Sequence, residues 1–203
     1  MKRILSFSSA FAFAVAMTMA TTVWADILPL SGVSAYFNSL KGAQSTFRQF
    51  NEDGSVSTGN FYIQRPGKMR FEYDPPDSAV VVAGSGAVVI YDKKSNQPAE
   101  TYPLRRTPLW LILADTVDLA REEMVIGHSF DGTYTLVTAQ DPENPEYGNI
   151  QLVLSSDPVN LQGWVVNDAN GGRTQVVLDK LSETSGLASS LFDVGKARPT
   201  RGR

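Results

Sequence analysis

Apolar and polar residues alternate along most of the chain after about residue 45. Ten segments have the period-two pattern of half-buried strands: STFRQFN, TGNFYIQ, KMRFEYD, SAVVVAG, GAVVIYD, EEMVIGHSF, TYTLVTAQ, NIQLVLS, LQGWVVND and RTQVVLDK. Turn residues such as Asp53-Gly54, Pro66-Gly67 and Asn170-Gly171 separate them. Short strands at intervals of about 8 to 12 residues are typical of one large antiparallel sheet, a sandwich or a barrel.

The segment SGVSAYFNSLKG has a helical pattern instead. Its apolar residues recur at helical spacing after Leu30, at Val33, Tyr36, Phe37 and Leu40. Gly42 is the expected stop, so the pattern predicts one amphipathic helix of about three turns.

A second helix is predicted within TPLWLILADTVDLAREE, which interrupts the run of strands. Thr107 is the predicted cap of a helix that begins at Pro108, and the six residues that follow Pro108 are apolar. A helix without a polar face until Asp115 must be covered on more than one side, by core, partner or ligand.

The first 25 residues have the layout of a secretory signal peptide. Lys2 and Arg3 precede the apolar run ILSFSSAFAFAVAMTMA, and Val23 and Ala25 supply the small residues of a cleavage site. The alternative is a transmembrane anchor, but the most apolar part of the run is shorter than the roughly 20 residues of a span. Cleavage after Ala25 leaves 203 − 25 = 178 residues, 26–203, with a charge of (18 − 2) − 21 = −5. We expect these to form one domain, with a frayed basic tail over about 195–203.

Composition narrows the class of protein further. A hydrophobic content of 42% argues against disorder, and no basic cluster suggests nucleic acid. The chain has no cysteine, so it has neither disulfides nor the acylated cysteine of a bacterial lipoprotein. If exported, it should be released as a soluble protein, and we expect a monomer.

Candidate chemistry is sparse. The single histidine, His128, lies within a predicted strand and reads as a structural or surface residue. Ser85 in AGSGA lies between two strands and lacks the nucleophile-elbow pattern, while Glu122 and Glu123 are adjacent and point apart. The sequence has no P-loop, dinucleotide fingerprint or cluster of metal ligands. We therefore predict no enzyme activity, no cofactor and no metal.

The predicted hairpin GNFYIQRPGKMRFEY contains one anomaly. Met69, Phe71 and Tyr73 share one face of the second strand, whereas on the first strand the apolar row of Phe61 and Ile63 continues into a charge, Arg65. From spacing alone, Arg65 is position i of a type II turn with its head in water. The apolar face suits a solid core or a cavity for long apolar chains.

Several segments together resemble the LolA family of periplasmic lipoprotein carriers. They are FRQF, DGSVSTGNFYIQRPGKMRFEYDPP, VVVAGSGAVVIYD and TYPLRRTPLWLIL, in this order and spacing. The resemblance is strong from Phe47 to Leu113 and extends to Phe192 only as a pattern of strands.

The resemblance implies a mainly β protein, a single antiparallel, strongly curved and unclosed β-barrel with a helical lid. Its cavity would hold lipoprotein acyl chains, received from an inner-membrane ABC transporter and released to an outer-membrane receptor or to the outer membrane directly. The cavity residues would be Phe47, Phe61, Ile63, Met69, Phe71 and Tyr73, and the lid residues Leu109, Trp110, Leu111, Ile112 and Leu113. Arg65 would hydrogen-bond backbone carbonyls of the lid, Pro108 to Ala114, when the carrier is closed and empty.

The chain is expected to depart from the family pattern at its C-terminus, because it ends with LFDVGKARPTRGR, where many carriers continue with a further loop and strand. Two other functions stay open at this point. One is a lipid-binding or envelope-stress sensing protein on the same fold, and the other is a hydrolase with an unrecognised site.

Overall fold

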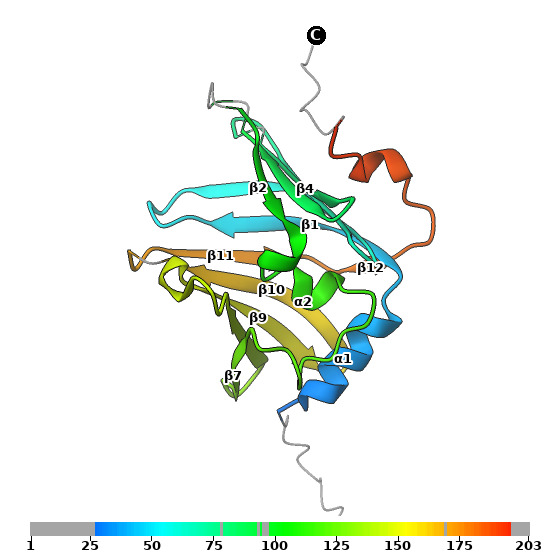
Figure 1. Ribbon diagram of the computed structural model, residues 1–203, viewed down its shortest axis with the longest axis vertical. Coiled ribbons are helices and arrows are strands. Elements are labelled where there is room, and N and C mark those ends of the chain that lie inside the picture. The colour runs from blue at the N-terminus through cyan, green and yellow to red at the C-terminus, as the bar shows by residue number, and fades with distance from the viewer. Residues whose placement is uncertain (1–26, 78, 93, 95–97, 169, 196–203) are drawn as a thin grey trace, which may run out of the picture.

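The computed structural model describes residues 27–77, 79–92, 94, 98–168 and 170–195, which form one curved sheet with few helices (Figure 1). The sheet has twelve strands in the order β6-β5-β4-β3-β2-β1-β11-β10-β9-β8-β7, and β12 pairs separately with β1. The outermost strands β6 and β7 are not paired with each other, so the barrel is unclosed. The predicted leader, residues 1–25, and the tail from residue 196 lie outside the described residues.

All ten predicted strands are present. They are β1 (Gly42–Phe50), β2 (Val56–Gln64), β3 (Lys68–Tyr73), β4 (Val80–Gly84), β5 (Ala87–Tyr91), β7 (Val125–Phe130), β8 (Thr135–Gln140), β9 (Asn149–Ser156), β10 (Val159–Asn167) and β11 (Arg173–Leu178). Two short strands were not predicted, β6 (Glu100–Pro103) and β12 (Ser182–Glu183). Every residue of both is exposed, so neither has the buried alternate positions that reveal a strand.

Helix α1 (Leu30–Ser39) confirms the first predicted helix and lies across one end of the strands (Figure 1). The prediction that Gly42 ends it is wrong. The helix ends at Ser39, the next residue Leu40 already has an extended backbone, and Gly42 is the first residue of β1. A Cβ atom at Gly42 would lie 2.6 Å from the carbonyl oxygen of Thr184, so glycine is required here for close packing of the chain around β12.

Helix α2 (Trp110–Leu113) is a single turn that lies in front of the middle of the sheet (Figure 1). The prediction of a helix from Pro108 capped by Thr107 is therefore wrong in its start. The residue that precedes α2 is Leu109, and no side chain caps the helix. The Thr107 hydroxyl instead donates a hydrogen bond to the carbonyl of Leu104, in the short 3-10 helix η1 (Leu104–Arg106). The other short helices are η2 (Pro145–Tyr147) and η3 (Ser189–Phe192).

The C-terminal segment covers the outer face of β3 and β4. Arg70 on β3 is 8% exposed and donates a hydrogen bond to the carbonyl of Leu191. A Cβ atom at Gly84 would overlap the carbonyl oxygen of Phe192. The sheet is consequently buried on both faces here, which explains why both parities of GAVVIYD are apolar: Val88 belongs to the inner core, and Val89 is also buried.

Candidate functional site: the contacts that close the lid

Arg65 follows β2 directly and points inward, in line with Phe61 and Ile63 as the alternation predicts. The residue is only 9% exposed. Its guanidinium group is therefore not in water, in contrast to the prediction from spacing alone. It donates one hydrogen bond to the carbonyl of Phe37, in the last turn of α1, and one of 2.6 Å to the carbonyl of Ala114, directly after α2. One side chain thus connects both helices to the sheet.

Two opposing effects act on the pKa of Arg65. Burial lowers its pKa, and the nearby negative charge of Asp115 partly opposes this effect. An arginine remains charged at any physiological pH, so the two carbonyl oxygens accept charge-assisted hydrogen bonds. The buried Nε atom finds no partner among the described residues, which makes this arrangement less stable than a fully paired arginine would be.

The turn between β2 and β3 also holds the lid through its backbone. The N–H of Gly67 donates a 2.8 Å hydrogen bond to the carbonyl of Leu113. Together with Arg65, it fixes the last residues of α2 against the tip of the hairpin. Sequence reasoning missed this contact, because a backbone donor carries no residue-specific signal.

Helix α1 is tied to the chain that follows the lid. The Asn38 side chain donates a 2.9 Å hydrogen bond to the Val117 carbonyl and accepts one of 2.9 Å from the Val117 N–H. The N–H of Leu119 donates to the Ser34 hydroxyl at 3.0 Å. These contacts fix residues 117–119 to α1 independently of Arg65. No sequence pattern pointed to Asn38, since its partner is again the backbone.

The six predicted cavity residues lie together in the core. Phe47, Phe61, Ile63, Met69 and Phe71 are buried, and the partly buried Tyr73 packs against them. The rings contact one another, with centroid distances of 5.5 Å for Phe47 and Phe71 and 4.8 Å for Phe61 and Phe71. Trp164 on β10, which was not predicted, completes the cluster at 5.2 Å from Phe71. In this structure the inner face of the sheet is packed by side chains.

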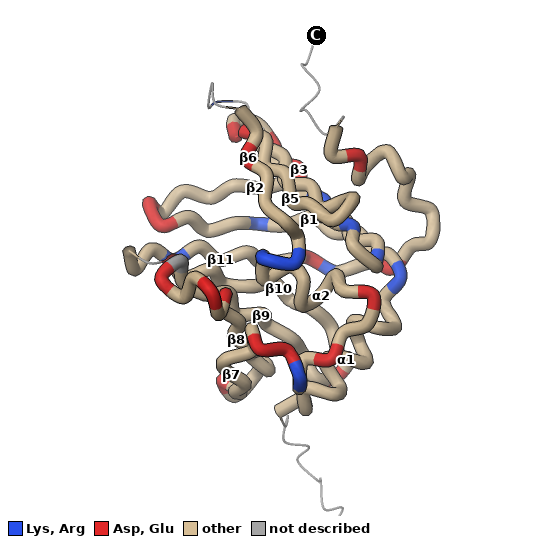
Figure 2. The backbone as a smooth tube through the Cα atoms, in the orientation of Figure 1, with Lys and Arg blue, Asp and Glu red and all other residues tan. Residues whose placement is uncertain are grey.

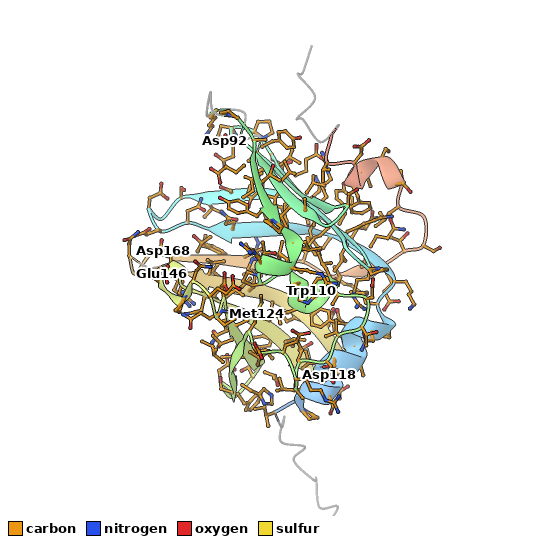
Figure 3. The ribbon with its side chains drawn as sticks, viewed as in Figure 1. Asp92, Trp110, Asp118, Met124, Glu146 and Asp168 are labelled. Carbon is orange, nitrogen blue, oxygen red and sulfur yellow. The ribbon has the colours of Figure 1, made fainter. Side chains whose placement is uncertain are left out.

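The lid residues divide into a buried and a half-buried set. Leu111, Ile112 and Leu113 belong to the core cluster, whereas Leu109 and Trp110 pack against its edge. Trp110 lies in front of the sheet (Figure 3), and the guanidinium carbon of Arg105 is 4.4 Å from its ring centroid. The core covers one side of this apolar segment, and Arg105 contacts the Trp110 ring on another, so the expected cover on more than one side by core, partner or ligand stays a prediction.

Tyr73 marks the polar end of the cluster. Its hydroxyl donates a 2.6 Å hydrogen bond to the Gln49 side chain. Burial, with a smaller contribution from the negative charge of Asp77, raises the pKa of Tyr73 to about 12. The phenol is therefore neutral at physiological pH, as a wall of an apolar compartment should be.

Other candidate groups have structural roles. His128 donates a 2.7 Å hydrogen bond from Nε2 to the carbonyl of Leu28, which holds the start of the described chain to β7. Over the described ranges, no three histidine or acidic side chains gather as metal ligands would. In the same ranges no helix is long and apolar enough to cross a membrane.

Charged residues cluster near the lid, with Arg105 and Arg106 before α2 and acidic residues after it (Figure 2).

Comparison with known proteins assigns the family. Residues 38–195 match the family described as outer membrane lipoprotein carrier protein LolA. An outer-membrane lipoprotein carrier protein of Methylococcus capsulatus is 32% identical over 184 residues, covering 83% of this chain and 84% of that protein. One of the same name from Chromohalobacter salexigens is 26% identical over 200 residues, covering 92% of each.

A solved structure from Vibrio parahaemolyticus, named for an outer membrane lipoprotein-sorting protein domain, has the same fold. Its TM-score is 0.50 at 11% identity, and the match covers 83% of this chain and 97% of that one. The family match spans every strand of the described sheet, Arg65, α2 and the segment over the outer face, but it includes only residues 38–39 of α1. The chain belongs to the LolA family of outer membrane lipoprotein carrier proteins.

Proposed function

We propose that this protein is a periplasmic carrier of lipoproteins. It would enclose the acyl chains of its cargo between the inner face of the sheet and the two helices, and shuttle them from an inner-membrane ABC transporter to the outer membrane. The cargo would leave either to an outer-membrane receptor or to the membrane directly. We expect no catalytic step, cofactor or metal in this process.

The observation that carries the proposal is the contact set of Arg65. Its two acceptors, the carbonyls of Phe37 and Ala114, lie at the ends of two separate helices, and both helices cover the apolar inner face. Loss of these bonds would weaken the hold on both covers at once. The exposed face would then be lined by Phe61, Phe71 and Trp164.

The energetics of lipid transfer explain why such a cover is needed. Each methylene of an acyl chain costs about 0.8 kcal/mol to expose to water, so a chain of ordinary length cannot cross the periplasm unprotected. Binding must nevertheless be reversible. A closed empty form, held by a few polar contacts, lowers the apparent affinity of the inner face because only the open form gives the cargo access to it. The unpaired Nε of Arg65 suits this purpose, since it limits how stable the closed form is.

The experiment that tests the proposal is transfer of native cargo. Purified mature protein is added to spheroplasts, and lipoproteins released into the medium are detected by immunoblotting. A carrier releases them in proportion to its concentration, whereas serum albumin at the same concentration serves as the control for unspecific extraction of lipid. No release above that control would count against the proposal.

Two further measurements separate the alternatives. A lipid-binding sensor on the same fold would retain lipid, detectable by mass spectrometry of the purified protein, but would release no lipoprotein. A hydrolase would turn over ester or glycosidic substrates, for which a carrier gives no product.

A further inference from the structure

A groove of about 320 Å³ lies beside the closed lid, between the residues that lead into α2 and the strands β9 and β10. Its walls come from β6, from the segment before α2, from the loop between β8 and β9, and from β9 and β10 themselves. The lining residues are Tyr102, Arg106, Thr107, Pro108, Leu109, Asp141, Gly148, Asn149, Ile150 and Val166.

The apolar part of the groove is continuous with the core. Ile150 belongs to the core cluster, and the lid residue Leu109 packs against that cluster. Tyr102 and Val166 remain 45% and 38% exposed, so water now contacts large apolar side chains next to the lid. Filling the groove with hydrocarbon would remove this surface from water.

Two polar groups of the groove, at Thr107 and Asp141, already have hydrogen-bond partners within the protein and need none from a ligand. The Thr107 hydroxyl is bonded to the Leu104 carbonyl, and the Asp141 carboxylate accepts hydrogen bonds from the Glu143 N–H and the Asn144 amide, both at 2.9 Å. A ligand without hydrogen-bonding groups therefore leaves these two groups paired. Arg106 is exposed at the rim and has donors for a carbonyl or carboxylate.

We propose that this groove binds one acyl chain while the lid is still closed, with the carbonyl end of the chain at Arg106. The inference rests on the proposed function, in which the cargo is lipidated. The groove volume lies at the lower end of the range of ligand pockets, roughly 300 to 1,000 Å³, which suits one chain and not several.

The position of the groove suggests how loading starts. The bonds of Arg65 to Phe37 and Ala114 are buried, so an arriving chain cannot reach them directly. The groove, in contrast, is open to solvent and has Leu109 of the lid as one wall. A chain in the groove contacts the lid before the lid moves, and it can favour the open form if it binds that form more tightly.

Binding of dodecanoic acid to the mature protein tests the proposal. The absence of native cysteine makes Val166→Cys a unique thiol in the groove, and Val56→Cys a matched one outside it. Val56 is 53% exposed near the β1–β2 turn. Saturating dodecanoic acid is expected to slow the reaction of the Val166→Cys thiol with a water-soluble disulfide reagent at least tenfold and to leave the Val56→Cys thiol unchanged.

Affinity for a fluorescent fatty acid, 11-(dansylamino)undecanoic acid, supplies the second measurement. Val166→Glu should weaken binding about tenfold, equivalent to about 1.4 kcal/mol, whereas the matched Val56→Glu should stay within twofold. Arg106→Gln should lose about threefold, the size of an exposed charge contact, and Arg121→Gln should lose nothing. Circular dichroism and thermal unfolding verify that each variant is folded.

The outcomes separate the groove from the proposed function. If wild-type protein binds the fatty acid and releases lipoproteins, but Val166→Glu binds equally well and the Val166→Cys thiol is not protected, the groove inference is wrong and the carrier function stands. If wild-type protein neither binds fatty acid nor releases lipoproteins, both are wrong. Release of lipoproteins without fatty-acid binding would likewise overturn the groove alone.

Discussion

Replacing Arg65 by leucine should shift the protein toward its open form. The substitution removes both donors that connect the sheet to Phe37 in α1 and to Ala114 after α2, while leucine preserves much of the apolar stem. The Gly67 to Leu113 backbone hydrogen bond remains, so the lid is weakened and not lost.

The size of the shift follows from the two bonds. A hydrogen bond to a charged group contributes about 1.5 to 3 kcal/mol, so two such bonds set an upper limit of roughly 3 to 6 kcal/mol. The buried charge and its unpaired Nε offset part of this, because leucine avoids both. We expect a net loss of about 1.5 to 3 kcal/mol for the closed form, which raises the open-to-closed ratio roughly tenfold to a hundredfold.

Acyl-chain affinity and transfer report this shift. Where the closed form predominates in the wild type, Arg65→Leu should bind a fluorescent fatty acid at least tenfold more tightly and should release lipoproteins more slowly to outer-membrane vesicles. Arg70→Leu is the matched control. Arg70 is also buried and also donates to a backbone carbonyl, but on the outer face, at Leu191. It should lower the thermal midpoint without changing acyl-chain retention.

The reasoning fails if Arg65→Leu binds and transfers acyl chains as the wild type does. It also fails if Arg70→Leu changes retention as much as Arg65→Leu, because a general loss of stability would then account for both.

Three further predictions concern the frame around the lid. Asn38→Ala should lower the free energy of unfolding by about 1 to 3 kcal/mol, because both backbone groups of Val117 lose their partner; thermal unfolding should show a midpoint several degrees lower. Gly59→Ala should destabilise by about 1 to 3 kcal/mol, since a Cβ atom would overlap the carbonyl oxygen of Glu72; an unchanged urea midpoint would contradict this. Tyr73 should titrate near pH 12 by ultraviolet absorbance. Since its folded pKa lies above the ordinary tyrosine pKa of about 10, the stability that it contributes should be lost as pH rises from about 10 to 12, a loss absent in Tyr73→Phe.

The strands could be predicted because burial imposes a visible period on them. Phe61, Ile63, Met69 and Phe71 alternate with polar residues and all lie in the core. The wrong or missing predictions concern segments in which buried and exposed residues do not alternate. Strand β6 has no buried residue. The sequence also does not reveal that the Thr107 hydroxyl bonds to Leu104, earlier in the chain, and not to α2.

From the residue pattern alone, the site was predictable only in its donor, and lid carbonyls as acceptors were implied only by the family resemblance. Strand parity placed Arg65 inward, but its acceptors are backbone oxygens at residues far away in the sequence, separated by 28 and 49 positions. Asn38 and Gly67 were missed for the same reason, because each binds the backbone. The groove could not be foreseen either, since its lining comes from β6, the lid and β8 to β10, which meet only in the folded protein.

The dependence on backbone acceptors has an evolutionary consequence. Any residue at position 37 or 114 offers the same carbonyl oxygen to Arg65, and any residue at position 113 offers one to Gly67. The segment 109–114 and the end of α1 can therefore exchange apolar side chains without losing these contacts, and under the proposed function such exchange would suit different acyl chains. Selection would act on the arginine and on the path of the chain, and leave the surface that meets the lipid free to diverge.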